Sequence, residues 1–552
     1  MESALAPKGP RLPSADLGHG RFQMMILACA QLSVAVDAYQ ALCSRLLTPP
    51  VDHWCRPPPE FAHMNPDLWR NVALPLGSDG RFNQCAVYEQ LSPSVREYET
   101  DTERRARLCH EWNYELPPGV QTMASRWNLV CDYAWHVTLV EVFNIICGLV
   151  MLPLAGQLSD KTGRRTIAIC CVVLAMCAAL ALAYANSLAV FAVSRAFVGA
   201  SVSSLRVNTI VLLFEVTTKC FRVFYCCLAQ AGLLLGSLAA TTLEGAGVLD
   251  MRVVAIIGIM PTLLLVFCFH ALEESPVWHL SMWKFDEAKD VLISMSRANG
   301  ITVIMNVPVL ERQFDIRRKE EVPALRSSCV LDMLTNEVLR GRVVRAFCVW
   351  FCLFFSMHAV WQHTPRHTNV WLLLTAVVPR AAALPAAYAL MRTFSRKQAL
   401  AMCVALSCCL AFGLAFVLLL SPPSSKVLLT LLCELTLASL GMTYTVVIIH
   451  SLELFPTMLR TMAVCTLLSC GRLGAAVATA IALPAQRLHS SAPLFLVTLS
   501  LLIAQVALIS LPETKHGTLL HTLYDLEVDV IKQTVMDILQ ECSFVGLRED
   551  YP

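Results

Sequence analysis

Charged residues are scarce in this sequence. Asp, Glu, Lys and Arg make up 15% of the 552 residues, whereas 56% are hydrophobic and the mean hydropathy is +0.58. A water-soluble surface of ordinary charge density needs more charge than this, so we expect most of the chain to lie in a lipid bilayer. The net charge is only +2, which excludes a global field that attracts nucleic acid. Any charge selectivity must therefore be local.

Signatures of catalysis and of cofactor binding are also missing. The sequence has no phosphate-binding GxxxxGK[ST] loop, no nucleophile elbow, no CxxC pair and no His and Cys cluster with metal-ligand spacing. We therefore expect no enzyme activity, no use of ATP, no metal and no cofactor. The first apolar run begins near Phe22 without a small-residue processing site, and it predicts a retained helix.

Long apolar runs dominate the rest of the chain. A helix of about 20 apolar residues spans the roughly 30 Å hydrocarbon core of a bilayer. The predicted fold is therefore an all-α membrane protein with about twelve transmembrane helices. The predicted spans are 22–43, 134–155, 166–185, 188–212, 224–246, 252–271, 344–362, 369–391, 398–420, 426–450, 460–483 and 491–511.

Two long connections divide these spans into halves of six helices. The predicted parts are a tail (1–21), a first half (22–280) that includes the long loop 44–133, a central loop (281–341), a second half (342–511) and a tail (512–552). Short loops rich in Lys and Arg face the cytosol. This places both tails and the central loop in the cytosol and 44–133 outside, on the basis of Lys161, Arg164, Arg165, Lys219, Arg222, Arg392, Arg396 and Lys397.

Four of the 24 cysteines lie in the loop that we expect to be extracellular: Cys55, Cys85, Cys109 and Cys131. Disulfides persist outside the cell, so two bridges are expected there. Three pairings are open, and free or partly paired thiols are the alternative. The other cysteines lie mostly in apolar runs, where a thiol behaves as a small hydrophobic group.

An internal repeat supports the division into halves. Glu215 and Arg222 follow the fourth span with the spacing E-x6-R, and Glu453 and Arg460 repeat it 238 residues later, after the tenth span. Glu274 and Glu513 follow the sixth and twelfth spans and lie 239 residues apart. Two nearly equal offsets predict a duplication with parallel halves.

The loop after the second span reads GQLSDKTGRR at 156–165 and resembles the loop signature of the major facilitator superfamily. Gly163 permits a tight turn, and charged links to helix ends such as Glu215 would break and re-form as the halves rock. The alternative is that the positive charges of this loop only set the orientation of the chain in the membrane. The resemblance implies a gating set of Asp160, Gly163, Arg164, Arg165, Glu215, Arg222, Glu274, Glu453, Arg460 and Glu513. The second-half loop, MRTFSRK at 391–397, lacks the glycine and the acid.

Further motifs lie along the whole chain. They are GRFQ (20–23), CHEWNY (109–114), WNLVCD (127–132), LEESPVW (272–278), FDEAK (285–289), ELFPTMLR (453–460) and LPETK (511–515). Together they resemble solute carrier family 22, the organic cation, anion and zwitterion transporters. Val277 departs from the family motif, and the loop 44–133 has no N-x-S/T sequon. The resemblance implies a plasma-membrane carrier that moves a small organic ion by alternating access, alone or in exchange for another anion.

Arg472 in the eleventh span is the leading candidate for substrate binding. An ionisable residue in a span is costly and indicates function. Its position matches the charge-selecting position of the family, where anion transporters carry arginine, so the resemblance implies an organic anion as substrate. A guanidinium can form a bidentate pair with a carboxylate or sulfate. The alternative is a structural arginine neutralised by a neighbour such as Glu434.

Other residues in the spans form a second tier of candidates. Arg380 lies near a position where the anion branch often has a lysine, and Arg206 could pair with Asp37 or Glu141 in a structural role. Arg195 is expected to make a packing or gating contact. Phe355 and His358 are three residues apart and could share one helix face. The full set of candidate substrate-binding residues is Arg472, Arg380, Phe355, Met357, His358, Tyr388 and Asn208.

Two rival functions follow from the same features. One is a carrier of organic cations or of carnitine-like zwitterions. The other is a family member that no longer transports and acts as a receptor, for which Val277 and the altered loop 391–397 are the motivation.

Overall fold

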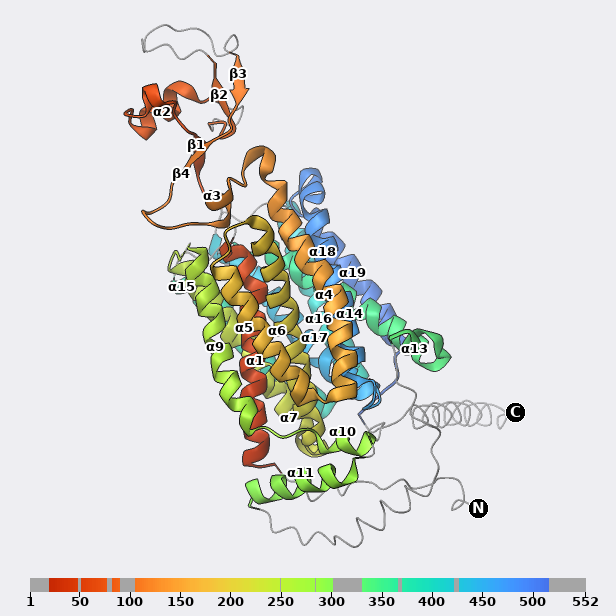
Figure 1. Cartoon of the computed structure of the whole chain (residues 1–552). Coiled ribbons are helices and arrows are strands. Elements are labelled where there is room, and N and C mark those ends of the chain that lie inside the picture. The colour runs from red at the N-terminus through yellow and green to blue at the C-terminus, as the bar shows by residue number, and fades with distance from the viewer. Residues whose placement is uncertain are drawn as a thin grey trace, which may run out of the picture.

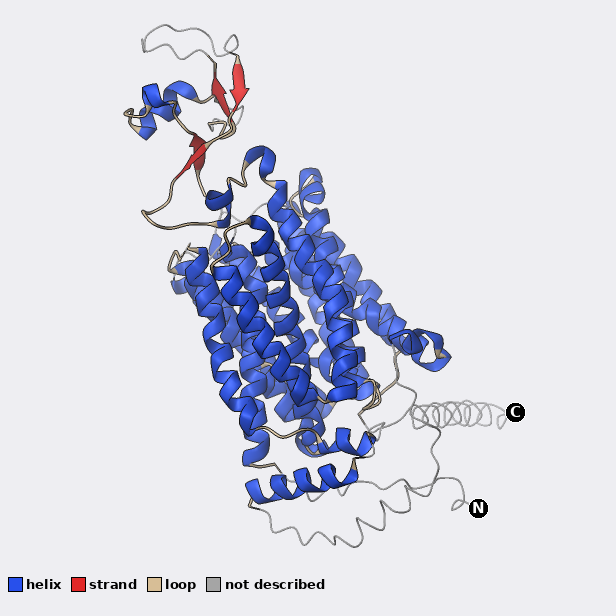
Figure 2. Ribbon diagram, viewed as in Figure 1, coloured by secondary structure: helices blue, strands red, loops and turns tan. Residues whose placement is uncertain are grey.

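The computed structural model describes residues 19–47, 51–76, 82–89, 105–248, 250–282, 284–300, 330–365, 370–420 and 426–515. Long, roughly parallel helices form one bundle, with a small strand-bearing segment at one end and short helices at the other (Figure 1). Figure 2 shows that strands occur in that segment outside the bundle. We call the two ends the strand-bearing end and the α10/α11 end.

The first half of the bundle contains six predicted spans. They are α1 (Arg21–Leu47), α4 (Trp135–Thr162), α5 (Arg164–Ala183), α6 (Leu188–Val216), the pair α7 (Lys219–Ala229) and α8 (Ala231–Gly245), and α9 (Met251–Ala271). The fifth span is interrupted at Gln230, which ends α7 and begins α8.

The second half contains the other six: α14 (Glu337–His363), α15 (Val370–Thr393), α16 (Arg396–Leu420), α17 (Lys426–Leu454), α18 (Arg460–Leu488) and α19 (Ala492–Ile509). Within the described ranges, ten helices are long and apolar enough to cross a membrane, with α7 and α8 counted together. The helices α9 and α15 occupy the predicted sixth and eighth spans. The predicted all-α membrane fold is confirmed.

The two halves meet along two seams. On one side α4 packs against α18, and on the other α7 and α8 pack against α15. Small residues permit the close approach of α4 to α18: a Cβ atom at Gly156 would lie 2.7 Å from the Cα atom of Met462. Seams between halves are where alternating contacts must break and re-form.

The strand-bearing segment contains two short antiparallel pairs. Strand β1 (His53–Cys55) pairs with β4 (Trp112–Tyr114), and β2 (Ala86–Tyr88) pairs with β3 (Ala106–Leu108). The short helices are η1 (Pro59–Phe61), α2 (Pro66–Ala73), α3 (Met123–Trp127) and η2 (Cys131–Tyr133). Trp54 and Trp69 form its small core.

The disulfides of this segment link Cys55 to Cys109 and Cys85 to Cys131. The structure thus selects one of the three pairings that the sequence left open. Because the apolar core is small, these bridges supply much of the constraint on the segment; a bridge that closes a long loop typically stabilises by about 2–4 kcal/mol.

Short helices lie at the opposite end, where the sequence predicted the end of the first half and a central loop. They are α10 (Pro276–Ser281), α11 (Phe285–Ala298) and α13 (Val330–Thr335). Ser275 caps α10 by accepting a hydrogen bond from the backbone N–H of Trp278. The position of α10 brings the Trp278 side chain beneath the end of α4.

Candidate functional site

A cavity of about 250 Å³ lies between the two halves. It is bounded by α1, α8, α14, α15, α17 and α18, so both halves contribute to its wall. Most of the wall is apolar, with a few polar groups, as is usual for a small-molecule site. The lining residues that the argument uses are Gln230, Phe354, Met357, His358, Trp361 and Arg380.

Arg380 is the arginine of the cavity wall, and its charge is paired. Its guanidinium lies 2.7 Å from the Oε2 atom of Glu434 on α17, which is buried. The Arg380 guanidinium also lies over the ring of Trp361, with 5.6 Å to the centroid. The wall therefore presents the Arg380 cation, and the Glu434 anion lies buried behind it.

One face of α14 forms the aromatic side of the cavity. Phe354, Met357, His358 and Trp361 line it, with the three- and four-residue spacing of a single helix face. Phe355, which was expected to share this face with His358, does not line the cavity: Phe354 does, and Phe355 belongs to the packed core.

Arg472 lies beside this cavity, at the seam between the halves, and does not belong to its lining. Its Nη2 atom donates to the carbonyl oxygen of Gly199, at 2.9 Å, and to the hydroxyl of Ser203 on α6. The alternative that Glu434 neutralises it is not what the structure shows, because Glu434 pairs with Arg380. Arg472 instead connects the second half to the first.

Arg206 on α6 pairs with Asp37 on α1, one of the two partners that the sequence suggested. Its Nη1 atom lies 2.7 Å from Asp37 Oδ2, and its Nη2 atom donates to the hydroxyl of Tyr444 at 2.6 Å. Ser203, which accepts from Arg472, donates to the other oxygen of Asp37. One chain of hydrogen bonds therefore runs from α18 through α6 and α1 to α17.

Arg195 lies on α6 one turn before Gly199, and it donates to the side-chain and backbone oxygens of Gln40, both at 2.7 Å. These neutral partners tie α6 to α1, which agrees with the expected packing contact. We define the central arginine cluster as Arg195, Arg206 and Arg472 together with Asp37.

Two candidates lie elsewhere. Asn208 is fully buried and connects α6 to α4 through the hydroxyl of Ser159. Tyr388 packs its ring against Phe224, with 5.7 Å between centroids, at the α7–α15 seam. Neither side chain lines the cavity, and both contribute to helix packing.

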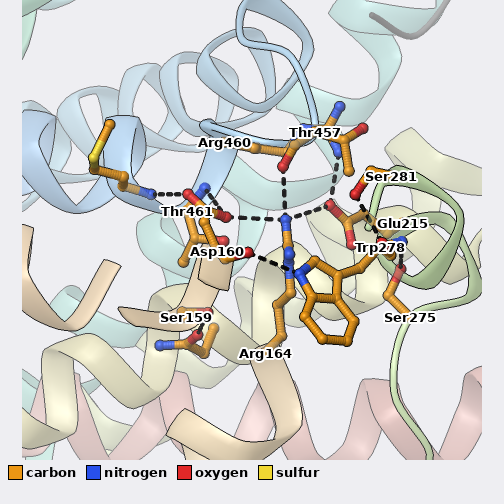
Figure 3. A network of polar contacts seen from close by, with 12 residues as sticks. Ser159, Asp160, Arg164, Glu215, Ser275, Trp278, Ser281, Thr457, Arg460 and Thr461 are labelled. Atoms are coloured by element: carbon orange, nitrogen blue, oxygen red, sulfur yellow. Dashed lines mark hydrogen bonds and ion pairs between the residues drawn. The ribbon is translucent and has the colours of Figure 1, made fainter. Parts of the chain in front are cut away.

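A buried ionic network joins the halves at the α10/α11 end (Figure 3). Glu215 on α6 lies 3.2 Å from the Arg164 guanidinium and 2.8 Å from that of Arg460 on α18. All three side chains are fully buried. Because Arg460 belongs to the second half and Glu215 to the first, this ion pair crosses the seam.

Asp160 caps α18 across the same seam. Its carboxylate accepts hydrogen bonds from the backbone N–H groups of Met462, at 2.8 Å, and Thr461, at 3.4 Å. A carboxylate at a helix N-terminus satisfies unpaired donors and interacts favourably with the helix dipole. Arg164 adds a hydrogen bond to the carbonyl of Thr457, at 2.7 Å (Figure 3). We call these contacts of Asp160, Arg164, Glu215 and Arg460 the latch.

The turn after α4 is held in place by Glu274, which follows α9. Gly163 has a φ of 109°, which glycine adopts without the strain of a side chain, and a Cβ atom there would overlap the carboxylate of Glu274. Glu274 accepts a hydrogen bond from the Arg165 backbone N–H at 2.8 Å. Burial raises the pKa of Glu274, while this contact and the Arg164 charge oppose the rise.

Glu513 occupies the equivalent place in the second half. It accepts hydrogen bonds from the backbone N–H groups of Arg396 and Lys397, each at 2.9 Å. Burial by itself would raise its pKa, but the N–H donors from Lys515, Lys397 and Arg396 outweigh burial and lower the pKa to about 2. Arg396 pairs with Glu453 at 3.3 Å.

Arg222 and Arg460 show the same local geometry. Each donates its Nε–H to the carbonyl eight residues earlier, Phe214 for Arg222 and Leu452 for Arg460. The repeat read from the sequence therefore has a structural counterpart.

In the part of the chain that the structure describes, one His and Cys group has the proximity of a metal site: His53, Cys85 and Cys131. Its two sulfurs are joined in a disulfide and cannot act as thiolate ligands. This group therefore gives no support to a metal.

Sequence reasoning missed Gln230, Phe354, Trp361 and Tyr444. Trp361 and Phe354 follow the helical period around His358, which is a usable signal. No local pattern marks Gln230 or Tyr444, because their role comes from contact with Arg206 on a distant helix.

The family description of the Major Facilitator Superfamily matches residues 132–479. The human organic cation/carnitine transporter 2 is 24% identical over 478 residues, which cover 84% of each chain. Solute carrier family 22 member 7 of Bos taurus is 26% identical over 534 residues, covering 92% of this chain and 94% of that protein. The proton:xylose symporter XylE superposes with a TM-score of 0.61 at 14% identity, over 92% and 98% of the two chains. This last likeness concerns the fold alone.

Proposed function

Because the chain belongs to the major facilitator superfamily, and its relatives confirm the predicted resemblance to solute carrier family 22, we propose that it carries organic anions across the plasma membrane. Secondary transport of small organic ions is common to this family, and these relatives are not enzymes. The choice of anions, the plasma membrane and exchange against a second anion are our proposals.

One observation carries the choice of anions: the central arginine cluster has a surplus of positive charge. Arg195, Arg206 and Arg472 lie together with a single carboxylate, Asp37, among the described contacts of the cluster. Arg195 and Arg472 both donate to neutral oxygens in these contacts, so two of the three guanidinium groups have no directly bonded carboxylate there. A buried surplus of positive charge next to a cavity favours an anionic ligand.

The latch supports alternating access. It holds the halves together at the α10/α11 end, so the cavity cannot open there until contacts of Asp160 and Glu215 break. The positive short loops support a cytosolic location for this end. The gating set proposed from the sequence is therefore retained.

A zwitterion is the second candidate, and the Arg380–Glu434 pair is the observation that favours it. A substrate with a carboxylate and an ammonium group could replace the 2.7 Å pair with two new ion pairs of the same kind. One relative is named as an organic cation/carnitine transporter, and carnitine carries a carboxylate and a quaternary ammonium, which would attract Glu434 by charge without donating a hydrogen bond.

Uptake of labelled benzoate, 4-nitrophenyl sulfate, carnitine and tetraethylammonium, divided by the surface amount of protein, tests the proposal. We expect Arg472→Ala to abolish anion uptake while the protein still reaches the surface, since losing a charged partner of a buried group costs about 2–5 kcal/mol. Arg472→Lys should rescue in part, because lysine keeps the charge and loses the planar fork.

Control variants separate the candidates. If the substrate is a zwitterion, Glu434→Gln should impair carnitine uptake. If the substrate is an anion, benzoate uptake should remain measurable in Glu434→Gln. Unchanged anion uptake by Arg472→Ala would defeat the assignment of Arg472. A well-expressed protein that moves none of the four compounds would favour a receptor.

A further inference from the structure

A second contact between the halves lies deeper in the bundle than the latch. Arg206 is on α6 of the first half and Tyr444 is on α17 of the second, and their hydrogen bond is 2.6 Å long. The guanidinium also lies over the Tyr444 ring, with 4.8 Å to the centroid. Both side chains are buried.

The partners of Arg206 are divided unequally between the halves. Among the described residues, Asp37 and Gln230 of the first half bind it at 2.7 and 3.2 Å, and Tyr444 of the second half binds it at 2.6 Å. An ion pair is harder to break in a buried site than a hydrogen bond to a neutral phenol. When the halves separate, the guanidinium should therefore stay with Asp37 and leave Tyr444.

The cavity touches one neighbour of each member of this contact. Gln230 lines the cavity and accepts a hydrogen bond from Arg206. Phe354 also lines the cavity, and its ring meets that of Tyr444 edge to face, with 5.8 Å between centroids. A molecule in the cavity that hydrogen-bonds to the Gln230 amide would compete with Arg206 for it. A molecule that displaces the Phe354 ring would shift Tyr444. Either change would weaken the Arg206–Tyr444 hydrogen bond.

We infer that Arg206 and Tyr444 form an inner gate beside the cavity, which a bound substrate loosens through Gln230 and Phe354. Asp37 is a positioning residue in this gate: it keeps the guanidinium on the first half through each cycle. The gate rests on the proposed transport function but differs from the latch in place and in partners.

Tyr444→Phe tests the gate because it removes the hydroxyl and keeps the ring. Tyr388→Phe is the matched control, since Tyr388 packs at the α7–α15 seam without lining the cavity. In purified protein without substrate, we expect backbone amides of 440–454 to exchange with deuterium at least fivefold faster in Tyr444→Phe, and at the wild-type rate in Tyr388→Phe. Equal exchange in all three proteins would overturn the gate.

Gln230→Leu tests the coupling to the cavity and keeps the proposal open to refutation if Tyr444→Phe does not fold. Benzoate should accelerate exchange of 440–454 at least threefold in wild type and not in Gln230→Leu, each protein being compared with its own rate without benzoate. Acceleration retained in Gln230→Leu would contradict the coupling. The substrate-free comparison does not need transport, so it stands even if every compound in the uptake panel fails.

Where benzoate is taken up, kinetics give an independent check. Tyr444→Phe should raise the turnover per surface molecule at least threefold and keep KM within twofold, because the hydroxyl holds the gate closed without contacting substrate. A parallel loss of turnover and rise of KM would indicate a merely structural role.

Discussion

The two turns at the α10/α11 end, 160–165 in the first half and 392–397 in the second, occupy equivalent positions and differ in what they hold together. Both are braced within their own half: Glu274 accepts from the Arg165 backbone, and Glu513 from Arg396 and Lys397. Bracing within each half has therefore survived the divergence of the repeats.

Contacts between the halves have not survived equally. Asp160 caps the N-terminus of α18, whereas the residue at its equivalent position is Arg392. Arg392 has no carboxylate that could accept from the first N–H groups of α7, the counterpart of α18, as Asp160 does for α18. The latch therefore has a carboxylate from the first half and no equivalent carboxylate from the second. The altered second loop has lost a contact between the halves, while the fold is kept.

The largest effect should come from the crossing ion pair. Glu215→Gln leaves Arg164 and Arg460 buried with less compensation, and removing one partner of a buried pair costs about 3–5 kcal/mol. We expect a strong fall in surface expression and in the thermal unfolding temperature. Glu453→Gln, at the equivalent position and more exposed, should cost clearly less. Equal losses in the two variants would remove the claimed asymmetry.

The cap itself should have the next largest effect. Asp160→Asn retains the shape of the side chain and loses the charge that faces α18. Loss of a helix cap costs about 1 kcal/mol of stability, and loss of the charge–dipole interaction costs about the same. We expect the protein to reach the surface and its uptake per molecule to fall about tenfold. Arg392→Asn is the control and should stay within twofold of wild type. A tenfold fall in both would show that the two turns are equivalent.

Restoring the missing acid should have a smaller effect. Because α7 packs against α15 as α18 packs against α4, Arg392→Asp places a carboxylate toward the N-terminus of α7. We expect a gain of about 0.5–1 kcal/mol, seen as a modest rise in the unfolding temperature, with slower turnover because two caps must then break. A lower unfolding temperature would contradict the inferred symmetry.

The smallest effect separates Glu274 from Glu513 by pH. Glu513 has a pKa of about 2, below its unfolded value, so its contribution to stability is present above the unfolded pKa and lost only as pH falls through about 2. Glu274 has a raised pKa, so the folded protein gains stability as the pH falls and this group takes up its proton.

Unfolding temperatures at pH 7 and pH 5 measure this difference. On acidification, wild type should gain stability relative to Glu274→Gln, and its advantage over Glu513→Gln should stay constant. The same pH dependence in both comparisons would mean that the two acids lie in equivalent environments after all.

Local sequence patterns were sufficient to predict the architecture of the helix bundle. Runs of about 20 apolar residues predict spans because the backbone must satisfy its own hydrogen bonds in lipid, and the E-x6-R repeats revealed the halves. The charged residues of the latch were also visible, since an acid or arginine at a helix end stands out in so apolar a chain. Two of the candidates on α14, Met357 and His358, line the cavity, whereas the three-residue spacing that paired Phe355 with His358 did not select a lining residue.

The sequence by itself thus determined the membrane class, the spans, the repeated E-x6-R pattern and the list of ionisable candidates. Only the tertiary structure decided which of them meet: Glu434 with Arg380, Asp160 with the start of α18, Cys55 with Cys109, and Phe354 in place of Phe355 at the cavity. The reason is physical. Periodicity and hydrophobicity act over neighbouring residues, whereas a pairing between helices hundreds of residues apart depends on their relative rotation and depth, which packing of the whole bundle sets.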